Sequence, residues 1–389
     1  MMPGQEGMLG HPGFSVLTED GRVRLLASGN SWIEGEAISQ LRKTAELPGM
    51  HLAVGLPDLH PGRGHPVGAA FITQGVLYPQ LVGNDVGCGM SLWRTDFKRQ
   101  KFSQDKYLKR LHGLESPWEG DTTSWLARYG VDPSESDMAL GTIGGGNHFA
   151  EVQAWHQIHD EQSFAALDLH KQSLTILVHS GSRGLGELLL RRHVEKFGAA
   201  GLLSDSEEGI SYLQGHDLAR QWAVANRALI ACRMAEQLHC TAGPVLDICH
   251  NSITPVKDDG TCGWLHRKGA APADVGPIVI PGTRGSLSYL VTPAGDQQPN
   301  AWSLAHGAGR RWNRQSAKAR LKDRYRADSL VRTPLGSDVI CEDKELLYEE
   351  APQAYKDIEV VIADMADVGL IHVVATLRPL ITYKVRRQA

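Results

Sequence analysis

The sequence predicts a mixed α/β protein, and three observations support this. Residues 174–178 form a short apolar run that ends at His179, which is typical of a buried strand. Residues 216–239 repeat apolar side chains near the 3.6-residue spacing of a helix packed on a core. His179 and His250 directly follow apolar runs, and α/β proteins gather ligands at the ends of strands.

Glycine, proline and the apolar spacing divide the rest of the chain in the same way. The turn sequence Glu19-Asp20-Gly21, for example, indicates a hairpin. The expected elements are that hairpin over 15–30, a helix over 34–45, a strand from His51 into a Pro- and Gly-rich loop, strand-like runs over 69–73 and 75–82, helices over 104–114, 124–129 and 185–197, and strands over 245–249 and from Pro277.

Composition is that of an ordinary globular protein with many turns. Of 389 residues, 42% are hydrophobic, 22% are charged and 42 are glycine, which excludes a disordered or fibrous chain. The formal net charge is −4, so there is no global basic field. Binding of nucleic acid would therefore need a local basic patch.

The cysteines and the apolar stretches predict a cytoplasmic protein. Six cysteines show neither paired CxxC spacing nor the density of a secreted scaffold, so we expect reduced thiols. Residues 1–13 lack the apolar core of a signal peptide. The most apolar stretch, 358–381, carries Asp364, Asp367 and Arg378, which argues against a membrane span.

A candidate metal site begins at the turn over 83–89. This turn places the carboxylate of Asp85 and the thiol of Cys88 three residues apart among glycines, which permit unusual backbone angles. Alone, such a turn is more often structural. His148, His179 and His250 lie in Gly-rich or polar surroundings and could supply the remaining ligands. Thiolate and imidazole donors by themselves would favour zinc.

Two further stretches could bind phosphate. Three glycines at 144–146 precede Asn147 and would let backbone N–H groups approach a ligand, although neither common nucleotide-binding fingerprint is present. His306 is followed by small residues and then by Arg310. If a helix begins near His306, both side chains would lie on one face and could hold a phosphate.

Other polar residues could have either a functional or a structural role. Asp58, in the loop after the strand from His51, could be functional or could satisfy backbone groups of that loop. Thr283 and Ser288 could bind a ligand or cap turns.

Taken in order, these motifs resemble the RtcB family of GTP- and manganese-dependent RNA ligases. Each motif is weak, but the ordered set is specific and covers about residues 50–384. The motifs are Asp85-Val-Gly-Cys88, Gly144-Gly-Gly-Asn147-His148-Phe-x-Glu151, His179-Ser-Gly-Ser-Arg183-Gly, His250-Asn251 and His306-Gly-Ala-Gly-Arg310. The resemblance implies one catalytic domain over 1–389, with mixed β-sheets, peripheral helices and a central two-metal cleft.

The resemblance also implies roles for the metal ligands. Cys88 corresponds to a thiolate that bridges two Mn²⁺ ions. Asp85 and His148 would complete the shell of one ion, and His179 and His250 that of the other. Manganese rests on the resemblance and not on the donor types, because its affinity ranks below that of competing metals.

His306 corresponds to the nucleophile that attacks the α-phosphorus of GTP and holds GMP. Asp58 and Arg183 match further positions near the site. The residues expected to bind GTP are Asn147, Glu151, Asn251, Thr283, Ser288, His306, Gly307, Gly309, Arg310, Tyr355 and Lys384. Glu151 would accept from N1 and N2 of guanine and thereby select GTP over ATP.

The implied reaction joins an RNA 3′-phosphate, or a 2′,3′-cyclic phosphate after hydrolysis, to a 5′-hydroxyl through an RNA-(3′)pp(5′)G intermediate. Partners would be GTP and RNA undergoing repair or tRNA splicing, with an accessory activating protein as a further candidate and no membrane. Two other classes remain open, namely a metal-dependent phosphodiesterase or phosphatase without a guanylylated intermediate and a non-catalytic RNA-binding relative.

Some positions depart from the family pattern. Ala305 replaces the usual serine before the nucleophile, and Val385 replaces the usual glycine after Lys384. These departures favour a divergent bacterial-type paralogue. A basic run over 311–326 offers a local patch for RNA, or else a solvated helix face. The candidate RNA contacts in it are Arg314, Lys318, Arg320, Lys322 and Arg324.

Overall fold

The computed structural model describes residues 13–258 and 260–386 and confirms a mixed α/β fold with several sheets. The larger sheet has eight strands and holds most of the site. Its path runs β10 (Ala242–Cys249), β6 (Gly89–Lys98), β8 (Ser173–Ser180), β7 (Phe149–Ile158), β18 (Ile371–Val385), β15 (Ser288–Pro293) and β14 (Ile278–Ile280), with β17 (Asp338–Cys341) parallel to β18.

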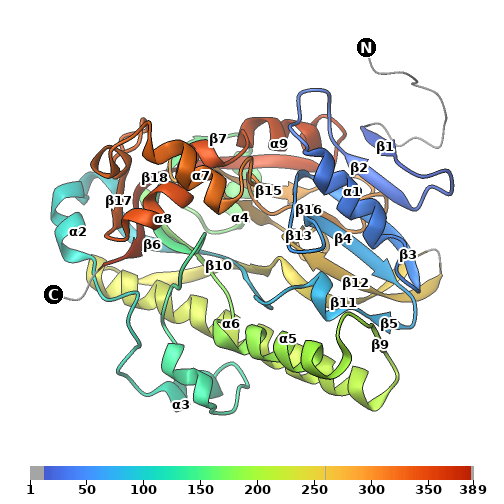
Figure 1. Cartoon of the computed structure of the whole chain (residues 1–389). Helices are drawn as coiled ribbons and strands as arrows, with labels where there is room; N and C mark the ends of the chain where they lie inside the picture. The colour runs from blue at the N-terminus through green and yellow to red at the C-terminus, as the bar shows by residue number, and fades with distance from the viewer. Residues whose placement is uncertain (1–12, 259, 387–389) are drawn as a thin grey trace.

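A second sheet of six strands lies beside the first on the right of Figure 1. Its order is β1 (Phe14–Val16), β2 (Val23–Leu26), β3 (Met50–His60), β4 (Val67–Thr73), β12 (Thr261–Lys268) and β11 (Asn251–Asp258). Two short pairs complete the strands: β13 (Ala270–Pro272) with β16 (Ser303–Ala305), and β5 (Val76–Leu77) with β9 (Leu202–Leu203).

Helices cover the outside of the sheets. The long α6 (Glu207–Leu238) packs against β8, β6 and β10, and α5 (Gly184–Phe197) runs beside it in Figure 1. The Oγ atom of Ser206 caps α6 by accepting from the N–H of Gly209. The other helices are α1 (Gly35–Thr44), α2 (Gln104–Arg110), α3 (Thr122–Ala127), α4 (Glu161–Ala166), α7 (Arg314–Lys322), α8 (Lys344–Glu349) and α9 (Ile358–Ala366).

Most predicted elements are found, with shifted ends. The strand-like run over 75–82 is the two-residue β5 followed by a 3-10 helix (Pro79–Leu81), because Pro79 has no N–H for a ladder and suits a helix start. The helix expected over 104–114 ends at Arg110, ahead of Gly113 with φ +73°. Asp58 lies within β3 and not in the loop after it.

The conditional helix at His306 is wrong. Ala305 pairs with Ala270 in a strand, and Gly309 then takes φ +71°, a left-handed conformation that breaks a helix. The next helix starts only at Arg314. His306 and Arg310 therefore do not share a helix face.

The cysteine and membrane predictions can be compared with the structure in part. All six cysteines lie among the described residues, and none of them forms a disulfide. No helix in the described part of the chain combines the length and apolarity that crossing a membrane requires. The prediction on residues 1–13 falls almost wholly outside the described residues.

Candidate metal centre and nucleotide cavity

Alternating strand direction brings the predicted ligands to one edge of the eight-stranded sheet. Because β10, β6, β8 and β7 are antiparallel neighbours, the end of one strand lies beside the start of the next. In register, Gly89 pairs with both Cys249 and Ser180, and Phe149 pairs with His179. The residues flanking these pairs, Cys88, His148 and His250, therefore meet at this edge.

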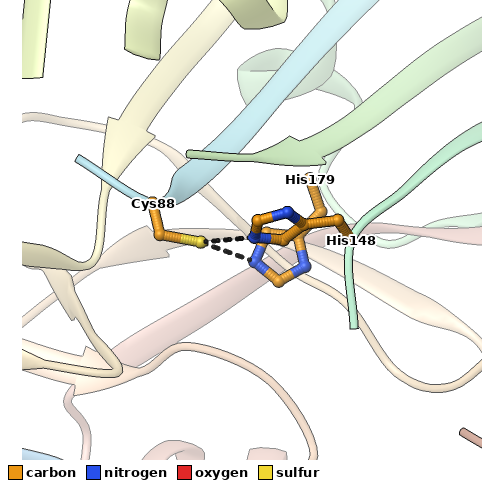
Figure 2. A group of neighbouring side chains, drawn as sticks. All are labelled: Cys88, His148 and His179. Carbon is orange, nitrogen blue, oxygen red and sulfur yellow. Dashed lines mark hydrogen bonds between the residues drawn. The ribbon is translucent and has the colours of Figure 1, made fainter. Parts of the chain in front are cut away.

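Cys88 lies at the centre of this group of donors. Its Sγ is 3.3 Å from Nε2 of His148 and 3.3 Å from Nε2 of His179, as Figure 2 shows. The three donor atoms lie within 4.8 Å of one another. Asp85 Oδ2 is 2.9 Å from His148 Nε2 on one side, and His250 Nε2 is 3.3 Å from His179 Nε2 on the other.

In His148 and His179, the hydrogen bond made by Nδ1 determines that Nε2 faces the cluster. Nδ1 of His148 donates to the carbonyl of Ile143 at 3.2 Å, and Nδ1 of His179 donates to the carbonyl of Asn147 at 3.2 Å. A carbonyl only accepts, so each Nδ1 carries the proton and each Nε2 presents its lone pair to Cys88. Hydrogen bonds from Nδ1 to a backbone carbonyl commonly orient metal-binding histidines.

This donor set fits a divalent metal. The lone pair of His148 Nε2 faces the Asp85 carboxylate at 2.9 Å, a contact between two acceptors that a shared cation would relieve. Ligands about 2.0–2.3 Å from a metal lie roughly 3.3 Å from each other around a tetrahedron, and the spacing of these donors is similar. Buried His250 Nδ1 has no hydrogen-bond partner within the described residues.

The electrostatics of the cluster favour neutral imidazoles. Burial, followed by neighbouring histidine charges, lowers the pKa of His179 and of His250 well below the ordinary value. Burial and the charge of Asp85 raise the pKa of the Cys88 thiol. Burial opposes ionisation of Asp85, whereas a hydrogen bond from the Cys88 thiol and the charge of Arg183 favour its carboxylate form. A bound cation would displace the thiol proton.

Small residues allow the close approach at this edge. An added Cβ at Gly181 would lie 2.0 Å from Oδ1 of Asp85, so only glycine leaves room for that carboxylate. Asn251 lies beside the cluster and is held at both ends of its amide, because Nδ2 donates to the carbonyl of Asp85 and Oδ1 accepts from the N–H of Gly269. Asn251 lines the cavity of the metal cluster together with Arg183.

His306 lies at the junction of this cluster and a second cavity. Its ring centroid is 4.9 Å from that of His250. Oδ2 of Asp58 accepts from His306 Nδ1 at 2.6 Å and from the backbone N–H of His306 at 3.1 Å. His306 and Asn147 line both cavities.

The second cavity gathers most of the residues predicted to bind GTP. It is lined by Asn147, Glu151, Thr283, Ser288, His306, Gly307, Gly309, Arg310, Tyr355 and Lys384. Asn251 is the exception, since it faces the metal cluster. Residues from five separate parts of the chain thus form one cavity, as their assignment to a single ligand requires.

Glu151 is buried in the wall of this cavity. Its two oxygens accept from Thr382 Oγ1 and Gln153 Nε2, each at 2.5 Å. Burial raises the pKa of Glu151 to about 7, and the two hydrogen bonds oppose this only in part. Its carboxyl group is therefore close to half-ionised at neutral pH.

Three cationic or phenolic residues of the cavity are held by neighbours. Arg310 donates to the carbonyl of Glu349 at 2.6 Å and to the carboxylate of Glu350 at 3.2 Å, and it stacks over the ring of Tyr355. Tyr355 also donates to Glu350. Lys384 donates to the carbonyls of Gly146 and His148, and burial lowers its pKa to about 8.

Some cavity residues were missed by the sequence analysis. Glu350 organises Arg310, Arg314 and Tyr355, and Arg284 also lines the wall. No local sequence pattern marks Glu350, because it lies in an ordinary acidic segment at the end of α8. Thr382 could have been found by its spacing, since it lies two residues before Lys384 on the same face of β18.

The basic run over 311–326 lies on and around α7. Acidic side chains compensate more of its charge than the sequence alone indicates. Lys318 and Lys322 both pair with Glu345 of α8. Arg314 pairs with Glu350 and borders both cavities. Arg320 stacks on Trp312, and Arg324 is exposed directly after the helix.

Comparison with known proteins identifies the family of this chain. The family model described as "tRNA-splicing ligase RtcB" matches residues 40–117 and 131–385. The chain is 49% identical to the RNA-splicing ligase RtcB2 of an Escherichia coli strain, over 93% of this chain and 95% of that protein. It is 29% identical to the tRNA-splicing ligase RtcB of Thermococcus kodakarensis, over 89% and 90%.

The RNA-splicing ligase RtcB of Escherichia coli K12 is 28% identical, over 95% of this chain and 98% of that protein. The chain belongs to the RtcB family. It is closer to the RtcB2 protein than to the K12 RtcB protein, which agrees with the expectation of a divergent paralogue.

Proposed function

We propose that this protein is an RNA ligase that uses GTP to join RNA 3′-phosphate, or 2′,3′-cyclic phosphate, ends to 5′-hydroxyl ends. The observation that carries the proposal is the position of His306, which lines both the metal-cluster cavity and the cavity of the predicted GTP contacts. Membership of the RtcB family supports it, because the relatives named above are described as splicing ligases.

His306 is suited to act as the nucleophile. The carboxylate of Asp58 only accepts hydrogen bonds, so the proton of the imidazole lies on Nδ1 and the lone pair lies on Nε2. Nε2 attacks the α-phosphorus of GTP, pyrophosphate leaves, and GMP is held on His306. Asp58 stabilises the positive charge that the ring gains on attack.

The later steps transfer GMP and then release it. An oxygen of the RNA 3′-phosphate takes GMP from His306, and the 5′-hydroxyl oxygen then attacks the RNA phosphorus and displaces GMP. A 2′,3′-cyclic phosphate would first be hydrolysed in the same site. Arg310, Lys384 and the neighbouring backbone N–H groups bind and orient the phosphates, and Glu151 reads N1 and N2 of guanine.

The metal ligands in this proposal are Asp85, Cys88, His148, His179 and His250. Cys88 lies within 3.3 Å of both His148 and His179, with Asp85 beyond the first and His250 beyond the second, and this set of five donors would be sufficient to hold two ions. Bound Mn²⁺ would neutralise charge on the attacking and leaving oxygens. The donor chemistry does not select manganese over zinc, so manganese rests on family membership.

The wider assignments belong to the same proposal. Residues 1–389 act as one catalytic domain, and unpaired cysteines favour a reducing, cytoplasmic location. RNA under repair and tRNA under splicing are the substrate classes, and an accessory activating protein is a further candidate partner. No contact of the described residues specifically favours a hydrolase.

The decisive experiment is incubation with GTP labelled at the α-phosphate and Mn²⁺, followed by denaturing electrophoresis. A ligase of this type acquires a covalent label that acid removes and alkali does not, because a phosphoramidate leaves once its nitrogen is protonated. Activity on RNA without GTP, and without a labelled protein, would instead identify a hydrolase.

A further inference from the structure

A stack of alternating indole and guanidinium groups lies next to the nucleotide cavity. The guanidinium of Arg311 is 5.1 Å from the ring centroid of Trp32 and 5.7 Å from that of Trp312. The guanidinium of Arg320 is 5.0 Å from the Trp312 ring. The order in space is therefore Trp32, Arg311, Trp312 and Arg320, here called the Trp–Arg stack.

The backbone holds this stack at the rim of the cavity. Arg310, which lines the cavity, immediately precedes Arg311 and Trp312 in the chain. The N–H groups of Arg311 and Trp312 both donate to the carbonyl of Ala354, at 2.8 and 3.2 Å. Trp312 also packs on the small core around Leu321, so the stack is preorganised.

The stack is accessible and its charge is not neutralised. Trp32 is 53% exposed, a high value for an indole, and Arg311 and Arg320 are exposed. Neither arginine forms an ion pair within the described part of the chain, whereas Lys318 and Lys322 nearby share Glu345. An exposed indole at the end of a row of unpaired cations matches a ligand with flat rings and a negative backbone.

We propose that the Trp–Arg stack is a platform on which unpaired bases of the RNA substrate stack as the strand leaves the active site. This inference rests on the proposed ligase function. Single-stranded nucleic acid is bound by aromatic faces that stack on bases and by cations that follow the phosphates. A base pair within a duplex hides its faces, so the platform favours single-stranded RNA ends.

The test measures binding of a labelled single-stranded RNA with a 3′-phosphate by fluorescence anisotropy, without GTP so that nothing turns over. Trp32→Ala should weaken binding by about fivefold or more, because stacking on one aromatic ring contributes about that factor at least. Trp32→Phe should retain most of the affinity. Binding of a blunt RNA duplex should not change in either variant.

Substitution of an arginine should change a different quantity, the salt dependence of RNA binding. Arg311→Ala should lower the slope of log affinity against log salt by somewhat under one unit, while Trp32→Ala should leave the slope unchanged. Arg128→Ala is the matched control, since Arg128 stacks on Trp125 at 5.3 Å next to α3, on the opposite side of the molecule in Figure 1. That control should bind RNA like the wild type.

Two outcomes would overturn the platform: wild-type affinity in both Trp32→Ala and Arg311→Ala, or an equal loss for single strands and duplexes. Labelling of the protein by GTP separates this from the ligase proposal. If the wild type forms no GMP adduct, the ligase proposal fails whatever the RNA affinities are. If Trp32→Ala forms the adduct normally but binds RNA weakly, both proposals stand.

Discussion

Oδ2 of Asp58 accepts two hydrogen bonds from His306, one from ring Nδ1 at 2.6 Å and one from the backbone N–H at 3.1 Å. The two residues lie 248 positions apart in the chain. One carboxylate oxygen thus fixes both the tautomer and the backbone position of the proposed nucleophile. The other oxygen, Oδ1, is buried without a partner among the described residues.

Asp58→Asn should slow formation of the GMP adduct by about 5- to 12-fold at saturating GTP. The substitution replaces a charge-assisted bond, worth about 1.5–3 kcal/mol, with a neutral one worth about 0.5–1.5 kcal/mol, a loss of about 1–1.5 kcal/mol. The apparent affinity for GTP should change little, because Asp58 faces the imidazole and not the nucleotide. Single-turnover labelling gives both numbers. A loss confined to affinity would mean that Asp58 binds substrate and does not position His306.

His306→Ala should abolish the adduct and the joining of ordinary ends. Substrate that is already activated as RNA-(3′)pp(5′)G should still be sealed, because that step needs no histidine nucleophile. Metal content, measured by elemental analysis, should equal that of the wild type. His51→Ala, a change at a partly exposed histidine of β3, serves as control. Joining by His306→Ala at the wild-type rate would disprove the nucleophile assignment.

Cys88→Ala should strip the metals while the fold is retained. Sγ of Cys88 is 3.3 Å from Nε2 of both His148 and His179, so the substitution removes the donor that the two proposed ions would share. Cys88→Ser should keep partial occupancy. The control is Cys341→Ala, at another buried cysteine, in β17. Wild-type metal content in Cys88→Ala, with unchanged circular dichroism, would refute a bridging role.

The affinity for GTP should rise with pH through about 7. Burial raises the pKa of Glu151 to about 7, so its carboxyl group is mostly neutral below that pH and mostly ionised above it. Only the ionised form can accept from both N1 and N2 of guanine, so affinity should gain up to about tenfold per pH unit below pH 7. Titration calorimetry from pH 6 to 8 measures this.

Glu151→Gln is the matched variant for that experiment. It should remove the pH dependence and reduce the preference for GTP over ATP, because the amide offers one acceptor in place of two. A wild-type affinity that is flat between pH 6 and 8, or a variant with undiminished GTP preference, would mean that Glu151 does not contact guanine.

Cations around α7 should contribute unequally to RNA binding. Replacing Arg320 and Arg324 with alanine should reduce the salt slope for single-stranded RNA by about 1.4 units, which is about 0.7 for each phosphate contact. Replacing Lys318 and Lys322 should reduce it less, because Glu345 already compensates both charges. Guanylylation should persist in both double variants. Equal slopes for the two would show that pairing with Glu345 does not persist in solution.

The sequence predicted those parts of the site that lie on local motifs. His179 and His250 follow apolar runs that the sequence shows, whereas β6 and β7, whose starts place Cys88 and His148, were not among the predicted strands. Which strands are neighbours is not local, so the assignment of Lys384 to the site came only from family resemblance, and its contact with the loop before His148 was not predicted. The apolar periodicity also did not predict the turn at Gly309.

The hydrogen-bond and ion-pair partners of some side chains could not be predicted from the sequence, for a similar reason. The amide of Asn251 is used by the backbone of Asp85 and Gly269, and Glu345 neutralises two lysines that the sequence presents as unopposed. Both effects depend on distances between segments that are remote in the chain. Charge counting within one window therefore overestimated the basic patch.

The bond from Lys384 to the carbonyl of His148 spans 236 positions, and it has a consequence for protein synthesis. A ribosome adds residues from the N-terminus at about 5–20 per second. The loop before His148 is therefore made at least roughly ten seconds before the lysine that holds it. Because this bond can form only after Lys384 has been added, the cluster reaches its final geometry once the C-terminal strand β18 has been synthesised, and we expect the folded site to bind metal only after that point.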